Sequence, residues 1–133
     1  MNQELLQPQE IEVFYIIPTI KKHFAVEMKK NGLKQKEIAK ILSIKDATVS
    51  QYLNDKRGNK ITFDGIIVEE IKKSSVKVKD TISYLREMQH LLRKVKETRA
   101  ICRIHKELSK IPNSCCPELI DCFGGEKDAT RNA

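Results

Sequence analysis

Apolar residues recur at helical spacing along most of the chain. Between residues 10 and 30, one face of a predicted helix carries Ile17, Ile20, Phe24 and Met28. Pro18 marks a start or a break within this stretch, because proline lacks the amide proton that a helix interior needs. Asn31-Gly32 predicts the end of the helix, since glycine readily adopts the left-handed conformation that closes many helices.

The next stretch predicts two short helices separated by a tight turn, over 34–43 and 47–54. Their inner faces carry Ile38, Ala39, Leu42, Ile44, Val49, Tyr52 and Leu53. Ala39 must be small, because the second helix is expected to cross close over it. Two short helices cannot bury both apolar faces alone, so we expect the preceding helix to cover them. A polar, basic loop follows at 54–59.

The second half of the chain also predicts helices. Asp64 is a suitable N-cap for a helix that carries Ile67, Val68 and Ile71. One long helix is expected from Val76 to Ser109, ended by Pro112. Its apolar stripe, which forms either part of the core or a seam with a second copy, consists of Ile82, Leu85, Met88, Leu92 and Val95.

These elements predict an all-α fold: an N-terminal helix-turn-helix domain, a long dimerisation helix and a C-terminal cysteine-rich segment. The expected units are the helix-turn-helix domain at 10–62 and a helical linker and dimerisation region at 63–100. A cysteine module at 101–125 and a flexible tail at 126–133 follow. With 133 residues, 5% aromatic residues and no Trp, a β-sandwich or barrel is disfavoured.

Positive charge is concentrated in one segment. The chain carries a net charge of +7, and residues 18–60 hold eleven Lys and Arg against four acids. Such a segment is typical of a phosphate-binding surface. A solvated lysine-rich helix face would give the same count, so charge alone only suggests nucleic acid.

The outward positions of the second short helix suit a DNA groove. Gln51 can pair with N6 and N7 of adenine, and the hydroxyls of Thr48 and Ser50 can read several bases. Lys45 and Asp46 stand at the helix N-terminus, where phosphate contacts and capping are natural. The full set of expected DNA contacts is Gln35, Lys45, Asp46, Thr48, Ser50, Gln51, Asn54, Lys56 and Arg57. The alternative is a hairpin of helices that is buried for packing alone.

Residues 14–60 resemble the lambda-repressor-like (XRE-type) helix-turn-helix regulators. The matching positions are Gln35, Ala39, Ile44 and Val49, with 49–54 running into Lys56-Arg57-Gly58. The stretch 17–21 is similar to a group of archaeal predicted transcriptional regulators. The resemblance implies a sequence-specific transcription regulator that binds double-stranded DNA. Ser43 departs from the family, which usually has Gly there, so we expect a slightly strained or opened turn.

We further expect a homodimer that reads a pseudo-palindromic operator, since one such domain offers few contacts for stable specific binding. The first rival is a plain or antitoxin-like DNA-binding module whose cysteines hold structural zinc. The second is an iron–sulfur or redox enzyme accessory whose helical front end binds protein.

The cysteines are clustered. Cys102, Cys115, Cys116 and Cys122 fall within 21 consecutive residues. The close cysteine pairs of zinc modules are missing, although Cys102-x2-His105 is a mixed version of one. Iron–sulfur clusters tolerate wider spacing, so we expect an iron–sulfur cluster, of the [4Fe-4S] type, on three or four of these thiolates. Zinc, a regulatory disulfide and buried inert cysteines are the alternatives.

The sequence shows no catalytic constellation: it has no glycine-rich phosphate loop, no Ser-His-Asp set and no apolar carboxylate pair. We therefore expect a protein that is not an enzyme. No targeting or membrane-spanning segment is visible, which favours a cytoplasmic protein. The functional hypothesis is a homodimeric regulator whose operator binding responds to the cluster held by the C-terminal cysteines.

Overall fold

The computed structural model describes residues 5–109, and every regular element in this range is helical. The elements are α1 (Pro8–Ile11), the π-helical segment η1 (Glu12–Ile16), α2 (Ile17–Lys30), α3 (Gln35–Leu42), α4 (Asp46–Leu53), α5 (Gly65–Ser75), α6 (Thr81–Glu97) and α7 (Ala100–Leu108). The predicted all-α class is confirmed for this part of the chain.

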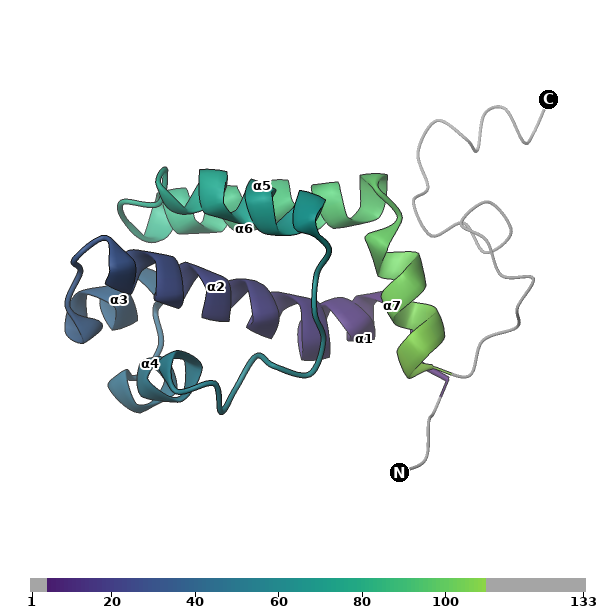
Figure 1. Cartoon of the computed structure of the whole chain (residues 1–133), viewed down its shortest axis with the longest axis horizontal. Coiled ribbons are helices and arrows are strands. Elements are labelled where there is room, and N and C mark those ends of the chain that lie inside the picture. The colour runs from purple at the N-terminus through teal and green to yellow at the C-terminus, as the bar shows by residue number, and fades with distance from the viewer. Residues whose placement is uncertain (1–4, 110–133) are drawn as a thin grey trace.

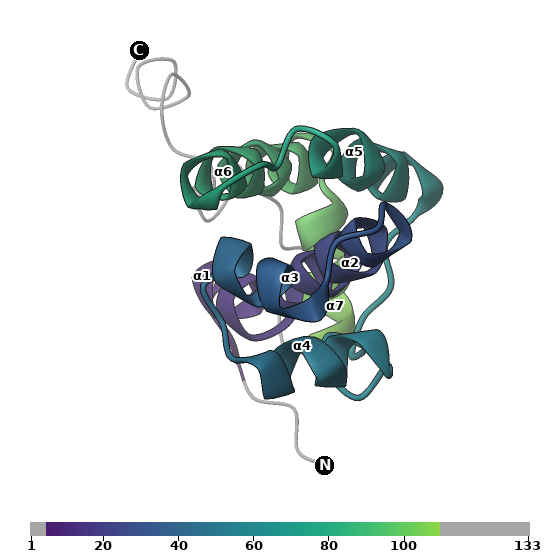
Figure 2. The ribbon, with the colours of Figure 1, turned by 90° about the vertical axis from the view of Figure 1, so that its left-hand side faces the viewer.

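The helices lie in three levels (Figures 1 and 2). Helices α5 and α6 lie side by side in one level, α2 and α3 form the middle one, and α4 lies on the opposite side of α2 from α5 and α6. Helix α7 crosses the end of the molecule and packs on α1. The middle position of α2 explains its burial, since it packs on α4, α5 and α6 at once.

Helices α1 and α2 are continuous through η1, and Pro18 explains the widened turn between them. Pro18 has no N–H to donate to the carbonyl of Phe14, and its ring would clash with that carbonyl in a regular α-helix. The chain adopts a π turn instead, in which the Ile17 N–H donates to the Glu12 carbonyl. Thr19 Oγ1 donates to the Tyr15 carbonyl at 2.7 Å. Pro18 therefore marks a local widening within one long helix.

The core is built from the apolar faces of η1 and of all the helices from α1 to α7. The side chains that are completely or almost completely buried include Ile20, Phe24, Ile38, Leu42, Val49, Ile67, Ile71 and Leu91. Phe24 of α2 meets Tyr84 of α6 edge to face, with ring centroids 6.1 Å apart. The predicted burial of the inner faces of α3 and α4 is confirmed for most of their residues, with Ala39 6% exposed, whereas Ile44 and Leu53 are only half-buried.

Left-handed residues end α2 and α3. Gly32 has φ +93°, and Leu33 N–H donates to the Met28 carbonyl, as a glycine-closed helix end requires. Ser43 takes the same role after α3 with φ +56°, while Ile44 N–H donates to the Ala39 carbonyl. The turn is thus closed in the usual hydrogen-bonding pattern. The strain expected at Ser43 is confirmed as a left-handed backbone on a residue with a side chain.

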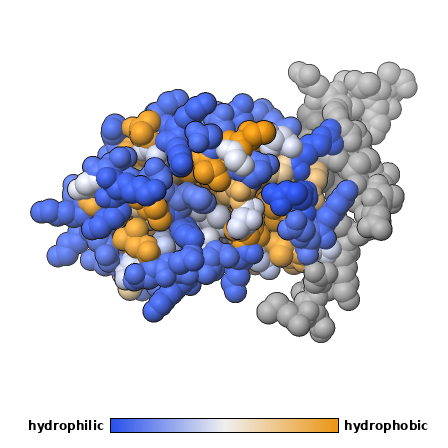
Figure 3. All heavy atoms as spheres, viewed as in Figure 1, coloured by the Kyte–Doolittle hydropathy of each residue, from blue (hydrophilic) through white to orange (hydrophobic). Residues whose placement is uncertain are grey.

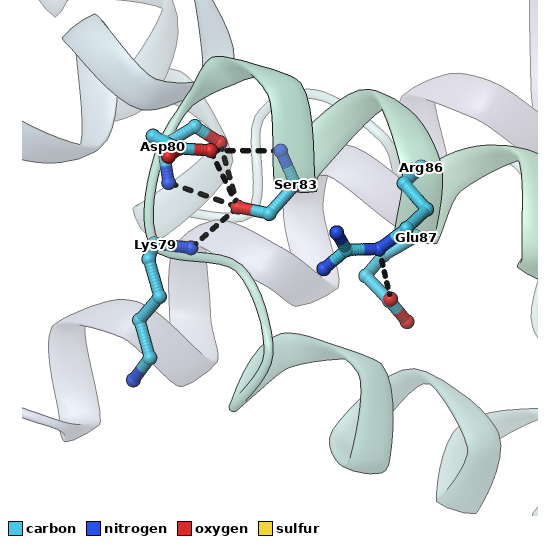
Figure 4. A network of polar contacts seen from close by, with 5 residues as sticks. All are labelled: Lys79, Asp80, Ser83, Arg86 and Glu87. Carbon is cyan, nitrogen blue, oxygen red and sulfur yellow. Dashed lines mark hydrogen bonds and ion pairs between the residues drawn. The ribbon is translucent and has the colours of Figure 1, made fainter.

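The expectation of one long helix from Val76 to Ser109 was wrong. The chain turns after α5, and α6 begins at a new N-cap, Asp80, whose carboxylate accepts from Ser83 N–H at 2.8 Å (Figure 4). Ser83 Oγ also accepts from the N–H of Lys79 at 2.8 Å. A second break follows α6 at Arg99, which has φ +61°. By contrast, the predicted N-cap Asp64 is confirmed by its 3.1 Å bond from Ile67 N–H.

The predicted apolar stripe of α6 divides into a buried and an exposed part. Met88 and Val95 are buried, whereas Ile82 is 70% and Leu85 is 51% exposed. The buried face also includes Tyr84 and Leu91, one position away from the predicted stripe. The core therefore takes only the C-terminal part of that stripe.

Candidate nucleic-acid interface

Helix α4 presents a polar face to solvent. Ala47, Gln51 and Asn54 are exposed and share one side of the helix, with Ser50 half-buried beside them. Asn54 Nδ2 lies 3.3 Å from Ser50 Oγ, so these two side chains are linked. Thr48 is half-buried and turned toward α2. Sequence reasoning missed Ala47, whose position follows from the spacing to Gln51 and whose methyl could contact a thymine methyl.

The first turns of α3 and α4 are tied together by Gln35. Its side-chain amide donates to the Asp46 carbonyl at 3.0 Å, which fixes the start of α4 against α3. The N-cap of α4 is Lys45, which is exposed, and Asp46 stands in the first turn. No cap bond from the side chain of Lys45 is present. The hydrogen bond from Gln35 thus fixes the orientation of the exposed face of α4 relative to α3.

A groove of about 490 Å³ runs between α2 and α4. Its lining residues are Pro18, Lys21, Ile44, Lys45, Thr48, Tyr52 and Arg57. Three of them are cationic, and no acid lines the groove among the residues that the structure describes. Lys21 was not predicted as a contact, because a lysine of the first helix can be assigned to this groove only once α4 is placed.

The cationic side chains that line the groove affect the charge state of their neighbours. Burial lowers the pKa of the Lys21 ammonium, and the nearby Arg57 guanidinium lowers it further. Burial raises the pKa of the Tyr52 hydroxyl, an effect that Arg57 opposes. An anion between Lys21 and Arg57 would relieve their mutual repulsion, so the groove favours phosphate or carboxylate.

The basic loop after α4 is held against α2. The end of α4 is closed by Asp55 with φ +58°, and Lys56 N–H donates to the Gln51 carbonyl at 2.8 Å. The Asp55 carboxylate forms an ion pair with Lys22 of α2. Gly58 has φ +70° and lies so close to Pro18 that a Cβ there would be 2.6 Å from the Pro18 carbonyl oxygen. These contacts fix the loop that carries Lys56 and Arg57.

Of the predicted metal ligands, only Cys102 lies within the described residues; Cys115, Cys116 and Cys122 lie outside them. Cys102 is half-buried on α7 and, with His105 and Glu12, lines a small pocket. The Nε2 atom of His105 lies 2.5 Å from the Leu6 carbonyl oxygen, which can only accept a hydrogen bond. Zinc bound through Nε2 would have to break this contact. Within residues 5–109, no group of three potential metal ligands is present.

No family model, curated protein or solved structure matches the chain. Within the described part of the chain, no helix is long and apolar enough to cross a membrane. The surface in Figure 3 is mostly hydrophilic, with scattered apolar patches.

Proposed function

We propose that this chain is a sequence-specific protein that binds double-stranded DNA and regulates transcription, with α3 and α4 acting as its helix-turn-helix unit. The observation that carries the proposal is the cationic groove between α2 and α4. It holds Lys21, Lys45 and Arg57 directly beside the exposed polar face of α4. Cations position a protein on phosphates, and polar side chains on an exposed helix read base edges.

The local architecture supports this assignment. An α-helix fits the major groove, and Ala47 and Gln51 of α4, with Asn54 at its C-cap, would face the bases there. Lys21, Lys45 and Arg57 would contact the phosphates of the adjoining strand. The Gln35 bridge, the Lys22–Asp55 ion pair and the close approach of Gly58 hold the two kinds of contact in a fixed relation. A preorganised interface of this kind loses little conformational entropy on binding.

The test compares Lys21→Gln with Lys73→Gln, which removes the same charge from the exposed side of α5. The affinity for a duplex selected from a random-sequence library is measured against salt concentration by fluorescence anisotropy. If Lys21 contacts one phosphate, the slope of log K against log salt falls by about 0.9 in Lys21→Gln. Lys73→Gln leaves the slope at the wild-type value. Equal slopes in all three folded proteins would contradict the assignment.

Sequence reading by α4 is tested separately with Gln51→Ala. A bidentate contact to a base contributes about 1–3 kcal/mol of discrimination, so preference for the selected duplex over random duplex should fall by tenfold or more. The salt slope should not change, since Gln51 is uncharged. Unchanged discrimination would remove Gln51 from the readout.

The homodimer and the cluster are further parts of the proposal. On α6, the exposed Ile82 and Leu85 could pair two copies. Sedimentation of the wild type and Leu85→Lys tests this, because the added charge should shift a dimer toward monomer.

For the cysteines, the test is the absorption spectrum of the anaerobically purified protein. An iron–sulfur protein absorbs visible light, whereas a colourless protein with stoichiometric zinc would exclude the cluster. Control by the cluster requires that holo and apo protein differ in affinity for the selected duplex.

A further inference from the structure

A second groove, of about 370 Å³, lies beside the basic loop. One wall is made by η1 and the start of α2, and the other by the loop at 56–60. The lining residues are Val13, Phe14, Tyr15, Pro18, Thr19, Lys56, Arg57, Gly58, Asn59 and Lys60. The groove therefore has an apolar, partly aromatic wall that faces a cationic one.

The apolar wall is open to solvent. Phe14 is 59% and Val13 is 57% exposed, among the most exposed large apolar side chains in the described residues. They lie on η1, whose π turn exists because Pro18 cannot continue a regular helix. The carbonyl of Pro18 also lies close to Gly58, so Pro18 shapes the helix that carries Phe14 and helps to position the opposite wall.

The cationic wall decides what can occupy this groove. Lys56, Arg57 and Lys60 line it, and within the part of the chain that the structure describes no acidic residue does. A second copy of this chain would bring the same cations with it, and like charges would oppose the pairing. A strand of nucleic acid offers phosphates to the cations and the apolar face of a deoxyribose to Phe14.

The two grooves adjoin each other, since Pro18 and Arg57 line both of them. Phe14 and Lys21 are seven positions apart in the sequence, which corresponds to about 10 Å along a helix. A duplex advances about 3.4 Å per nucleotide along its axis, so this distance spans at most about three nucleotides of one strand. A strand bound at Lys21 would therefore reach Phe14 within about three steps.

We propose that the second groove binds the sugar–phosphate backbone of duplex DNA next to the base pairs that α4 reads, with Phe14 packed against a deoxyribose and Lys60 against a phosphate. The inference rests on the proposed DNA binding and extends it to a flanking segment. The protein would then protect a length of DNA that extends beyond the base pairs whose sequence it reads.

The experiment uses the full chain and the duplex selected from the random library. Phe14→Ala, Lys60→Gln and the control Ile66→Ala, an exposed apolar residue of α5, are compared by anisotropy and by hydroxyl-radical footprinting. Phe14→Ala should weaken DNA binding about fivefold, because about 40 Å² of apolar surface would no longer be buried in the complex. The salt slope should not change, since no charge is removed. Lys60→Gln should lower the slope by about 0.9.

Both variants should also lose protection of up to about three nucleotides next to the base pairs that affect binding, whereas Ile66→Ala should keep this protection. Wild-type affinity and footprint in Phe14→Ala would overturn the inference, and binding that still depends on Lys21 and Gln51 would leave the proposed function standing. Weaker self-association of Phe14→Ala in sedimentation, with unchanged DNA affinity, would instead assign the groove to a second copy. Failure of the wild type to bind any duplex would refute both proposals.

Discussion

Replacement of Gly58 by alanine should both destabilise the protein and displace its basic loop. Gly58 has φ +70°, a conformation that costs about 1 kcal/mol or more for a residue with a side chain. The added Cβ would lie 2.6 Å from the Pro18 carbonyl oxygen and 2.9 Å from Lys22 Cβ. Relief of such an overlap costs about 1–3 kcal/mol. We expect Gly58→Ala to lower the free energy of unfolding by about 2–4 kcal/mol.

Two other glycines separate the causes. Gly32 has φ +93° with no atom within 4 Å of its Cβ position, so Gly32→Ala should show the conformational cost alone. Gly65 has neither a positive φ nor a near neighbour, and Gly65→Ala should be neutral or slightly stabilising. Urea unfolding measures all three, and with a slope of about 2 kcal/mol/M the Gly58→Ala midpoint falls by about 1–2 M.

The close approach of the loop to α2 is what this comparison tests. If Gly58→Ala and Gly32→Ala lose the same stability, the contact between Gly58 and Pro18 is not formed in solution. Because the overlap is relieved only by movement of the loop, DNA affinity should also fall more in Gly58→Ala than in Gly32→Ala. Equal affinities would mean that the position of the loop does not matter for binding.

Two more predictions concern stability. Ser43→Gly should raise the free energy of unfolding by about 0.5–1 kcal/mol, because glycine adopts the left-handed φ of +56° without strain. Ser43→Ala should bring no such gain, and equal urea midpoints for the two variants would contradict this prediction. Burial raises the pKa of Tyr84 from 10.0 to about 12. The protonated Tyr84 hydroxyl therefore makes its full contribution to the free energy of unfolding below pH 10, and this contribution is lost as the pH rises through 12. The wild type should therefore lose more stability than Tyr84→Phe over this range, and parallel pH profiles would refute the assignment.

Much of the helical organisation could be predicted from residue patterns. The spacing of Ile38, Leu42 and Val49 indicated the inner faces of α3 and α4, because a period of 3.6 residues leaves little choice of face. Gly32 and Asp64 act at helix ends through local chemistry, which a single sequence displays directly. These features depend only on near neighbours in the chain.

The misjudged parts depend on contacts between distant residues or on weaker local signals. The break before α6 had a signal, the Asp80-x-x-Ser83 capping pair, which the apolar stripe obscured. Arg99 offers no comparable signal, since arginine has no preference for a left-handed backbone. The inclusion of Ile82 and Leu85 in the stripe was reasonable from spacing, but only the packing of α6 on α5 and α2 decides which residues become buried.

The residues of the candidate site likewise fall into those that local sequence indicates and those that depend on tertiary packing. Gln51 and Arg57 could be named from local sequence, because an exposed amide on a short helix and a following basic loop are both local features. Lys21 could not, because it joins the site through the packing of α2 on α4. Phe14 could not either, because it joins the site only through the groove that it lines with the loop at 56–60.

The central claim is that DNA binds on the side of the molecule formed by α4, the loop after it and the start of α2. The most direct measurement is an NMR titration of the isotope-labelled full chain with the selected duplex, which follows the backbone amides one by one. The account predicts shifts concentrated at 18–22 and 45–60, with α5 and α6 little changed away from any site of self-association. Shifts confined to α5 and α6, or none at saturating duplex, would contradict it.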